Sequence, residues 1–225
     1  MLNPAIRLLK RPLKWLLPSK IDTERYRASI NPVFSYSKSA RSWETTLDVG
    51  IGGWCEVSNL SGGYHGLLRQ WWDYYGLGAK VLLVSETVVV RREFETMYRG
   101  KEFVATDYFT EISADRNPPD VVWNMYEEPP ASLKRGSFSS IICQATLEHI
   151  HDPIGVLRRL VALLGPTGYL CIHTHTPGFQ YHPFSRDYLR FYPDWFQDIS
   201  LTIPAVEVVE IHCGGGYAFC LIRKK

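Results

Sequence analysis

The chain has 225 residues, 45% of them hydrophobic and 21% charged, which is the composition of one folded domain with a short appendage and excludes collagen-like, coiled-coil and wholly disordered classes. The formal net charge is +2, but residues 1–20 carry five basic and no acidic side chains. The rest of the chain therefore has 20 basic against 23 acidic residues, a balance that argues against a nucleic-acid partner. Five cysteines without a C-x-x-C pair indicate reduced core thiols in a cytoplasmic protein.

Residues 1–20 interleave the basic side chains with leucines and Trp15, a mixture typical of a segment at an anionic membrane surface. No apolar run is long enough to span a bilayer, and Lys10, Arg11, Pro12 and Lys14 interrupt what would be the apolar core of a secretory signal. A helix that docks on the domain through its leucines is the alternative. We expect a cytoplasmic protein that residues 1–20 could hold at the inner face of a membrane.

Residues 21–66 have an irregular pattern and are interpreted as an accessory segment of unknown shape. Alternating pieces such as SWETTLDVGI (42–51) predict one or two β-strands there. TLDVGIGG (46–53) invites interpretation as a strand with a nucleotide-binding glycine loop. However, the next residues, CEVSNLSGGYHG, are rich in turn formers where that motif requires a helix, so we disfavour a nucleotide loop at this position.

Residues 67–225 alternate regularly between predicted helices and strands and are interpreted as one domain. The predicted strands lie at 79–86, 101–107, 120–124, 138–144 and 168–175, with helices at 67–76, up to about 98, and at 153–164. Residues 205–212 and 217–225 predict an antiparallel hairpin joined through glycines. The predicted fold class is α/β, a doubly wound and mostly parallel seven-stranded sheet with an antiparallel C-terminal hairpin.

From residue 79 onward the chain resembles the class I S-adenosylmethionine-dependent methyltransferases, as a type 11-like, Rossmann-like variant. The resemblance rests on SFSSIICQATLEHIHDPIGVLRRLVALLGPTGYLCI (137–172), on HPFSRDYLRFYPDWFQDI (182–199) and on the terminal hairpin. It covers about two thirds of the chain and implies S-adenosylmethionine as cofactor.

The chain departs from that family in three places. SETVVVRREF (85–94) has no glycine where most members have a glycine-rich loop, so a Cβ at each position occupies the space next to the methionine part of the cofactor. Ser139 stands where the family has an Asp. Ala145 stands where metal-binding members have a Glu, and Glu148 and His149 alone offer few oxygen ligands, so we expect no metal.

The ends of the predicted strands supply the candidate cofactor residues, because open α/β sheets bind ligands beyond the carboxyl ends of their strands. Asp107 lies 21 residues beyond Glu86, close to the spacing at which an acidic residue holds a nucleotide ribose. The resemblance implies that Asp107, next to Tyr108, binds the ribose hydroxyls and that Asn124 and Met125 contact adenine. It also implies that Gln144 lines the methionine end and that Glu86 pairs with the cofactor's amino group.

Methyl transfer to a hydroxyl requires an aligned acceptor and a base, a role that suits histidine. His149, His173, His175 and His182 follow the fourth and fifth predicted strands. We expect His182 or His175 to be the base and Asp187 to orient it, while His149 also fits a structural role before the helix at Asp152-Pro153.

The aromatic residues after the fifth predicted strand allow two interpretations: stacking on a sugar or planar acceptor, or packing of a helix by Tyr188, Phe191 and Trp195. We expect O-methylation of a small-molecule or glycan hydroxyl. A catalytically inactive methyltransferase-like binding or scaffold protein is the alternative. Dinucleotide-dependent oxidoreduction is disfavoured because its glycine fingerprint is absent.

Overall fold

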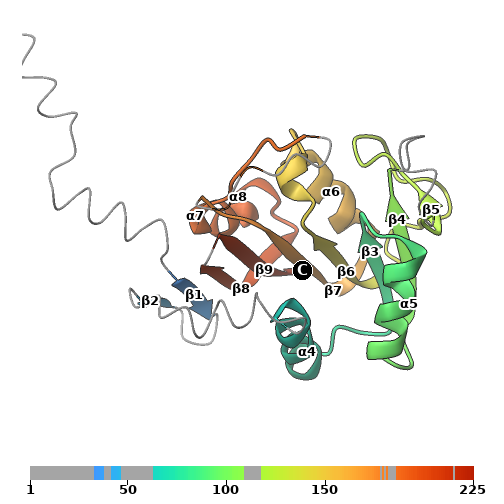
Figure 1. Ribbon diagram of the computed structural model, residues 1–225, viewed down its shortest axis with the longest axis horizontal. Helices are drawn as coiled ribbons and strands as arrows, with labels where there is room; N and C mark the ends of the chain where they lie inside the picture. Colours follow the sequence, from blue (N-terminus) through green and yellow to red (C-terminus); the bar gives the residue numbers. More distant parts are fainter. Residues whose placement is uncertain are drawn as a thin grey trace, which may run out of the picture.

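The computed structural model describes residues 33–37, 42–46, 63–108, 118–177, 179, 181, 186–214 and 216–225. Over these residues the chain forms a nine-stranded sheet with helices on both faces (Figure 1). The elements, in chain order, are β1 (Val33–Ser37), β2 (Ser42–Thr46), α4 (Gly63–Tyr75), β3 (Lys80–Val84), α5 (Val88–Met97), β4 (Glu102–Asp107), β5 (Val121–Val122), β6 (Phe138–Gln144), the 3-10 helix η2 (Leu147–His149), α6 (Pro153–Leu163), β7 (Leu164–His175), α7 (Pro193–Gln197), α8 (Ile199–Thr202), β8 (Val206–Gly214) and β9 (Tyr217–Lys224).

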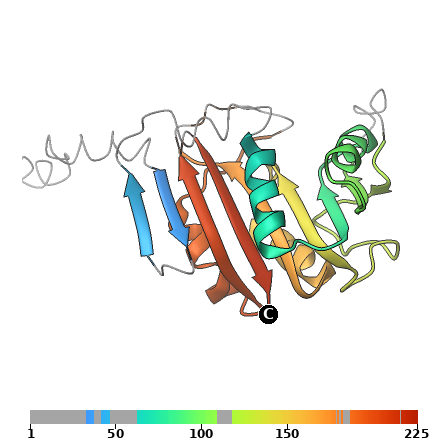
Figure 2. The ribbon, with the colours of Figure 1, turned by 90° about the horizontal axis from the view of Figure 1, so that it is seen from below.

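The strands lie in the order β2-β1-β8-β9-β7-β6-β3-β4-β5. Neighbours from β7 to β5 are parallel, whereas β9 pairs antiparallel with both β7 and β8. The strands from β8 to β5 confirm the predicted seven-stranded, mostly parallel sheet with an antiparallel C-terminal hairpin. The accessory segment adds β1 and β2, which extend the sheet antiparallel beyond β8 (Figure 2).

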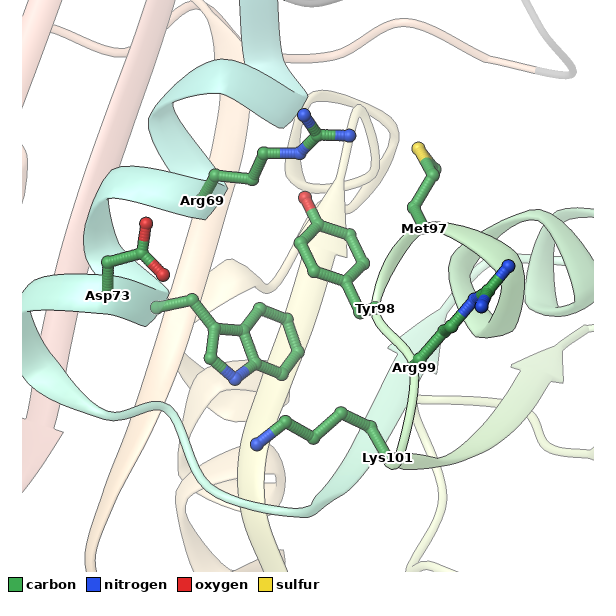
Figure 3. A pocket seen from close by; sticks show the side chains of 7 residues that line it. Arg69, Asp73, Met97, Tyr98, Arg99 and Lys101 are labelled. Carbon is green, nitrogen blue, oxygen red and sulfur yellow. The ribbon is translucent and has the colours of Figure 1, made fainter.

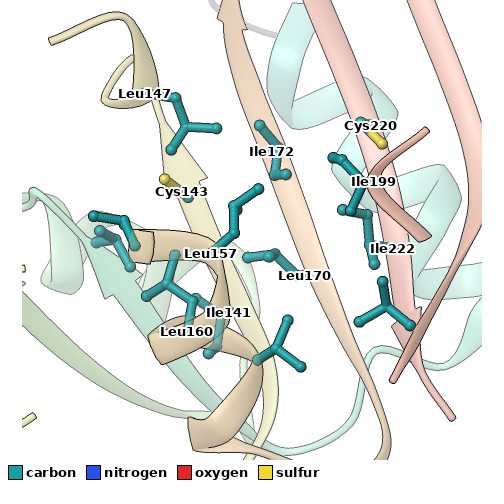
Figure 4. Packing of buried hydrophobic residues seen from close by; sticks show 14 of the residues in the cluster. Ile141, Cys143, Leu147, Leu157, Leu160, Leu170, Ile172, Ile199, Cys220 and Ile222 are labelled. Atoms are coloured by element: carbon teal, nitrogen blue, oxygen red, sulfur yellow. The ribbon is translucent and has the colours of Figure 1, made fainter. Parts of the chain in front are cut away.

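Helices cover the central strands on both faces, and the apolar runs of those strands are buried as a result. On one face α4, which crosses the front of the sheet in Figure 2, packs with α5 through Leu68, Trp71 and Phe94. On the other face α6, α7 and α8 pack against the apolar side chains of β6, β7 and β9 (Figure 4). Four cysteines, Cys143, Cys171, Cys213 and Cys220, are buried and unpaired by disulfides, which confirms the prediction for these positions.

The predicted elements agree with the structure within a few residues, with two differences. β5 has only two residues, because the Asn124 side chain accepts a hydrogen bond from the Tyr126 amide (3.1 Å) and closes a turn directly after the strand. The short helices α7 and α8 were not predicted. Phe196 and Ile199, fully buried, tie them to the core, which favours the packing interpretation of the aromatic segment near them.

Ser139 explains one departure from the family pattern. Its hydroxyl donates to the carbonyl of Lys80 (2.8 Å) and accepts from the amide of the same residue (2.9 Å), so it joins the start of β6 to the start of β3. This position lies at the amino ends of the strands, opposite to the edge where ligands bind. Ser139 therefore carries no information about cofactor binding.

Glu210, on strand β8 of the C-terminal hairpin, anchors α4 to the sheet. It accepts hydrogen bonds from Trp71 Nε1 (2.7 Å) and from the Tyr75 hydroxyl, and it pairs with His212 Nε2 (3.0 Å). These contacts fix α4 over the strands. Within the ranges that the structure describes, no helix is both long and apolar enough to span a membrane.

Candidate active site at the carboxyl ends of the strands

The strand order reverses direction between β3 and β6, and the carboxyl-end side of the sheet at this switch point is called the crevice below. From β3 the chain continues outward to β4 and β5, and it then returns to β6 and proceeds to β7 on the other side. Ligands of open α/β sheets bind at such a switch point, outside the carboxyl ends of the strands. Ser85 and Glu86 follow β3 there, and Ala145 follows β6.

Both strands that flank the crevice end in a left-handed residue that is not glycine. Ser85 has φ +59° and Ala145 has φ +44°, a conformation that L side chains adopt at an energetic cost. The backbone thus makes after β3 the kind of turn that a glycine would permit, but with a Cβ present. Strain of this kind is concentrated at functional sites.

Replacing Ser85 by Gly is expected to raise the free energy of unfolding by about 0.5–1 kcal/mol, because the relief of left-handed strain exceeds the entropy that glycine adds to the unfolded chain. Urea denaturation of both proteins measures the difference. Ser137→Gly serves as control, since Ser137 has no positive φ. An unchanged or lower stability of Ser85→Gly would mean that the Ser85 turn is not strained.

Glu86 and Asp107 bring two carboxylates to adjacent strand ends at the crevice. The Glu86 amide donates to the Thr106 carbonyl (3.1 Å), and Asp107 Oδ1 accepts from the Tyr108 amide (2.8 Å). Burial, together with the negative charges of Asp107 and Glu93, raises the pKa of Glu86 to about 8. Burial also raises the pKa of Asp107. Within the described ranges neither carboxylate has a cationic partner, so the pair is suited to a ligand that brings hydroxyl donors or a positive charge.

The raised pKa of Glu86 predicts a loss of stability with increasing pH. Folded Glu86 keeps its proton up to about pH 8, whereas in the unfolded chain it ionises near pH 4.5. The unfolded chain therefore gains stability relative to the folded state, and the free energy of unfolding falls, as the pH rises through this window. Between pH 6.5 and 8 we expect the free energy of unfolding to fall by about 1 kcal/mol more in the wild type than in Glu86→Gln, after a discount for solvent screening. Urea denaturation at both pH values measures this, and an equal fall in both proteins would contradict it.

The other predicted cofactor residues lie along the same edge with different exposures. Tyr108 is exposed and Gln144 is half-buried at the end of β6. The Met125 side chain is buried in the core, and the Asn124 amide is used in its turn, where it also donates to Glu127 Oε1 (3.0 Å). A nucleobase could therefore contact only the backbone of residues 124–125 and the edges of the Asn124 and Met125 side chains.

A buried histidine-carboxylate pair lies at the end of β7. His175 Nδ1 is 2.9 Å from Glu148 Oε1, and the Thr174 hydroxyl donates to Glu148 Oε2 (2.6 Å). Although burial raises the pKa of Glu148, the nearby His175 imidazole and the hydrogen bond from Thr174 outweigh it and lower the pKa overall. Glu148 Oε1 thus lies beside Nδ1, one of the two ring nitrogens of His175.

Aromatic and ionic contacts cover the His175 ring. Phe179 stacks on it with 3.6 Å between ring centroids, and the Arg190 guanidinium lies 5.8 Å from the centre of the Phe179 ring. Arg190 in turn donates to both oxygens of Asp187, with 2.6 Å between Nη2 and Oδ2. Glu148 is therefore the carboxylate that the structure places beside His175, and the role of Asp187 in orienting the base, His182 or His175, stays a prediction.

The remaining predicted histidines have separate positions. His149 hydrogen-bonds through Nδ1 to the Arg186 carbonyl, a structural role that holds the chain after β7. His173 stacks on Phe219 (4.5 Å between centroids), and burial lowers its pKa to about 3, so it is neutral. His182 lies outside the residues that the structure describes, as does the glycine-rich stretch at 50–53.

Glu148 is the functional candidate that the sequence analysis missed in this role. Its position in Leu-Glu-His was considered only for a metal. Across residues 63–108, 118–177 and 186–214 the structure contains no group of three or more potential metal ligands. The pairing with His175 depends on β6 and β7 being neighbours, and the signal that could have found it is the predicted parallel pairing of these strands.

The comparisons with known proteins agree with this architecture. A family model described as "Methyltransferase domain" matches residues 45–213, about three quarters of the chain. No curated protein matches the sequence.

Solved structures resemble the chain at low sequence identity, which concerns the fold alone. One is a chain in the complex between the Haloferax volcanii Trm112 methyltransferase activator and the putative methyltransferase (TM-score 0.53, 12% identity, 72% of this chain and 94% of that one). Another is a SAM dependent methyltransferase from Archaeoglobus fulgidus (TM-score 0.51, 13% identity, 72% and 93%). The third is trans-methyltransferase CalH in complex with SAH, of which the chain spans about half (TM-score 0.52, 16% identity, 66% and 52%). The chain belongs to the methyltransferase domain family and is a class I S-adenosylmethionine-dependent methyltransferase.

Proposed function

We propose that this methyltransferase transfers the methyl group of S-adenosylmethionine to a hydroxyl of a small molecule or glycan, with His175 as the base. The observation that carries the proposal is the pair of His175 Nδ1 and Glu148 Oε1, 2.9 Å apart, at the carboxyl end of β7 beside the crevice. A hydroxyl is a poor nucleophile until its proton is removed, and a neutral imidazole whose other nitrogen is fixed by a carboxylate suits this step.

The residues at the crevice fit the cofactor that the family uses. Asp107 would accept hydrogen bonds from the ribose hydroxyls, and Glu86 would pair with the amino group, which relieves the repulsion between the two carboxylates. The turn at residues 124–125 would contact adenine, and Gln144 would line the methionine end. When bound, the cofactor supplies a methyl group activated by a sulfonium.

The protein itself aligns the acceptor hydroxyl with the methyl group and provides a base for the hydroxyl proton. The acceptor oxygen forms a bond to the methyl carbon as the carbon–sulfur bond breaks, and the hydroxyl proton passes to His175 Nε2. Glu148 holds the ring and stabilises the imidazolium that results. Phe179 covers the ring and excludes water from it.

Exposed aromatic side chains near the crevice support an acceptor with a ring face. Tyr126 stacks on His151 (4.4 Å between centroids), and its hydroxyl accepts from the His151 amide (3.1 Å). Tyr188 meets the same histidine edge to face at 6.1 Å. Aromatic faces of this kind stack on sugar rings and planar molecules. Residues 1–20 would hold such an enzyme at the cytoplasmic face of a membrane, where lipid-linked saccharides are acceptors within reach.

Incubation with methyl-labelled cofactor and a panel of hydroxylated small molecules and saccharides tests the proposal. We expect label in a product stable to alkali, as an ether is, and loss of that label in His175→Gln. Label only on nitrogen, on carbon or in nucleic acid would contradict it. Cofactor binding without transfer to any acceptor would instead favour the alternative of a catalytically inactive binding or scaffold protein, for which the glycine-free turn after β3 is the supporting observation.

A further inference from the structure

A cavity lies near the amino ends of β3 and β4, on the opposite side from the crevice. It has a volume of about 390 Å³ and lies between the second half of α4 and the connection from α5 to β4 (Figure 3). The residues that line it are Arg69, Trp72, Asp73, Met97, Tyr98, Arg99 and Lys101. Because the connection leads into the amino end of β4, this cavity is separate from the cofactor site. Its volume is in the range of small-molecule sites.

The lining of the cavity carries three basic side chains and one acidic one. Arg69 and Tyr98 point toward one another (Figure 3), and the rise that burial causes in the pKa of Tyr98 is partly offset by the positive charge of Arg69. Lys101 Nζ lies 5.6 Å from the centre of the Trp72 ring, and Arg99 stands at the rim. Among the described residues, neither Arg99 nor Lys101 forms an ion pair with a carboxylate, and the three basic side chains and Asp73 give the lining a net positive charge.

Trp72 provides an independent observation at the wall of this cavity. Its side chain is only 9% exposed, and within the part of the chain that the structure describes its indole nitrogen Nε1 has no hydrogen-bond partner. Tyr98 stacks on the ring with 4.7 Å between centroids and holds it in place. A buried N–H donor without an acceptor is rare in native structures and calls for an explanation such as a bound group.

We propose that this cavity binds the phosphate group of a phosphorylated small molecule. The phosphate oxygens accept charge-assisted hydrogen bonds from Lys101, whose amine lies beside the Trp72 ring, and one oxygen accepts from the Trp72 indole. The guanidinium of Arg69, at the other end of the cavity in Figure 3, adds to the positive charge that attracts the ligand. The volume is more than ten times the roughly 30 Å³ that a water molecule occupies in the liquid, which leaves room for an organic body beside the phosphate. Arg99 adds attraction at the entrance.

Calorimetric titration with glucose 6-phosphate, and with glucose as the uncharged control, tests the proposal. In protein with ¹⁵N-labelled tryptophan, Trp72→Phe identifies the Trp72 indole signal, which we expect to shift with the phosphorylated sugar alone. Lys101→Gln is expected to weaken binding about tenfold, the loss of one charge-assisted contact. Arg92→Gln, an exposed basic residue of α5 that does not line the cavity, is expected to bind as the wild type does.

A parallel arm separates a soluble phosphate ester from a lipid headgroup. Vesicles of phosphatidylcholine with and without phosphatidic acid are tested against the same variants. Binding to the phosphatidic acid vesicles alone, weakened by Lys101→Gln and not by Arg92→Gln, supports the phosphate site and identifies a headgroup as its source. Binding of neither probe, or equal weakening by both variants, overturns the proposal. Cofactor titrations of the same variants stay unchanged, because the cavity lies away from the crevice.

Discussion

Replacing His175 by Gln is expected to lower kcat for a hydroxyl acceptor by about 10²- to 10⁴-fold, the usual contribution of a positioned general base, with a smaller change in KM. Glutamine keeps a polar side chain of similar reach but cannot take up the proton. Cofactor affinity is expected to stay unchanged, because His175 lies at the end of β7 and not beside the carboxylates of β3 and β4. Steady-state kinetics with the acceptor, together with cofactor titration, measure both effects.

A matched control is available in a second histidine-glutamate pair. His212 Nε2 lies 3.0 Å from Glu210 Oε2 on β8, a separation similar to that between His175 and Glu148 but through the other ring nitrogen, and far from the crevice. His212→Gln should keep kcat. Glu148→Gln should lower kcat and shift the pH profile of kcat, because the carboxylate no longer fixes the Nδ1 proton. Full turnover in His175→Gln, with an unaltered pH profile in Glu148→Gln, would show that the acceptor needs no base at this position.

Asp107→Ala is expected to weaken the binding of S-adenosylmethionine by about 100-fold, the loss of two hydrogen bonds to a charged group. The same substitution should lower the pKa of Glu86, since the charge of Asp107 is one of the causes that raise it. Calorimetry measures the affinity, and the pH dependence of unfolding measures the second effect. Glu102→Ala is the control, because Glu102 lies at the other end of β4 and pairs with Lys80 on the surface. Equal affinities in the wild type and Asp107→Ala would remove Asp107 from the cofactor site.

The sheet could be predicted from the sequence because its central strands are short, continuous apolar runs that glycine, proline and polar residues delimit. β6 begins and ends at the predicted residues, Phe138 and Gln144. The attachment of β1 and β2 beyond β8 could not be predicted, since edge pairing depends on which strand is left open by the rest of the fold. The helices α7 and α8 are too short for a helical period to show.

The candidate site could be predicted only in part, because some of its contacts join residues that are far apart in the sequence. Glu86 and Asp107 could be proposed from the sequence because strand ends and a 21-residue spacing are visible in it. The proposed role of Glu148 could not be predicted, because it depends on a contact with His175, which lies 27 residues away on the next strand. The predicted role of Asp187 beside the base is not tested by its contact with Arg190, which is a separate interaction.

The loop after β3 has no glycine, but its backbone adopts a conformation that glycine favours. Ser85 adopts at φ +59° a left-handed conformation that glycine adopts at no steric cost, so the chain enters α5 at Val88 after a sharp turn. This conformation cannot be inferred from the letters SETVVV. It is the reason why absence of the glycine motif does not exclude a cofactor crevice at this position.

Calorimetric titration of the full chain with S-adenosylmethionine and with S-adenosylhomocysteine is the most direct test of the central claim, that the crevice of Glu86 and Asp107 holds the cofactor without a glycine loop. We predict one-to-one binding of both compounds with micromolar affinity. No binding of either compound by a folded, monodisperse sample would contradict the account and would mean that the crevice does not hold the cofactor.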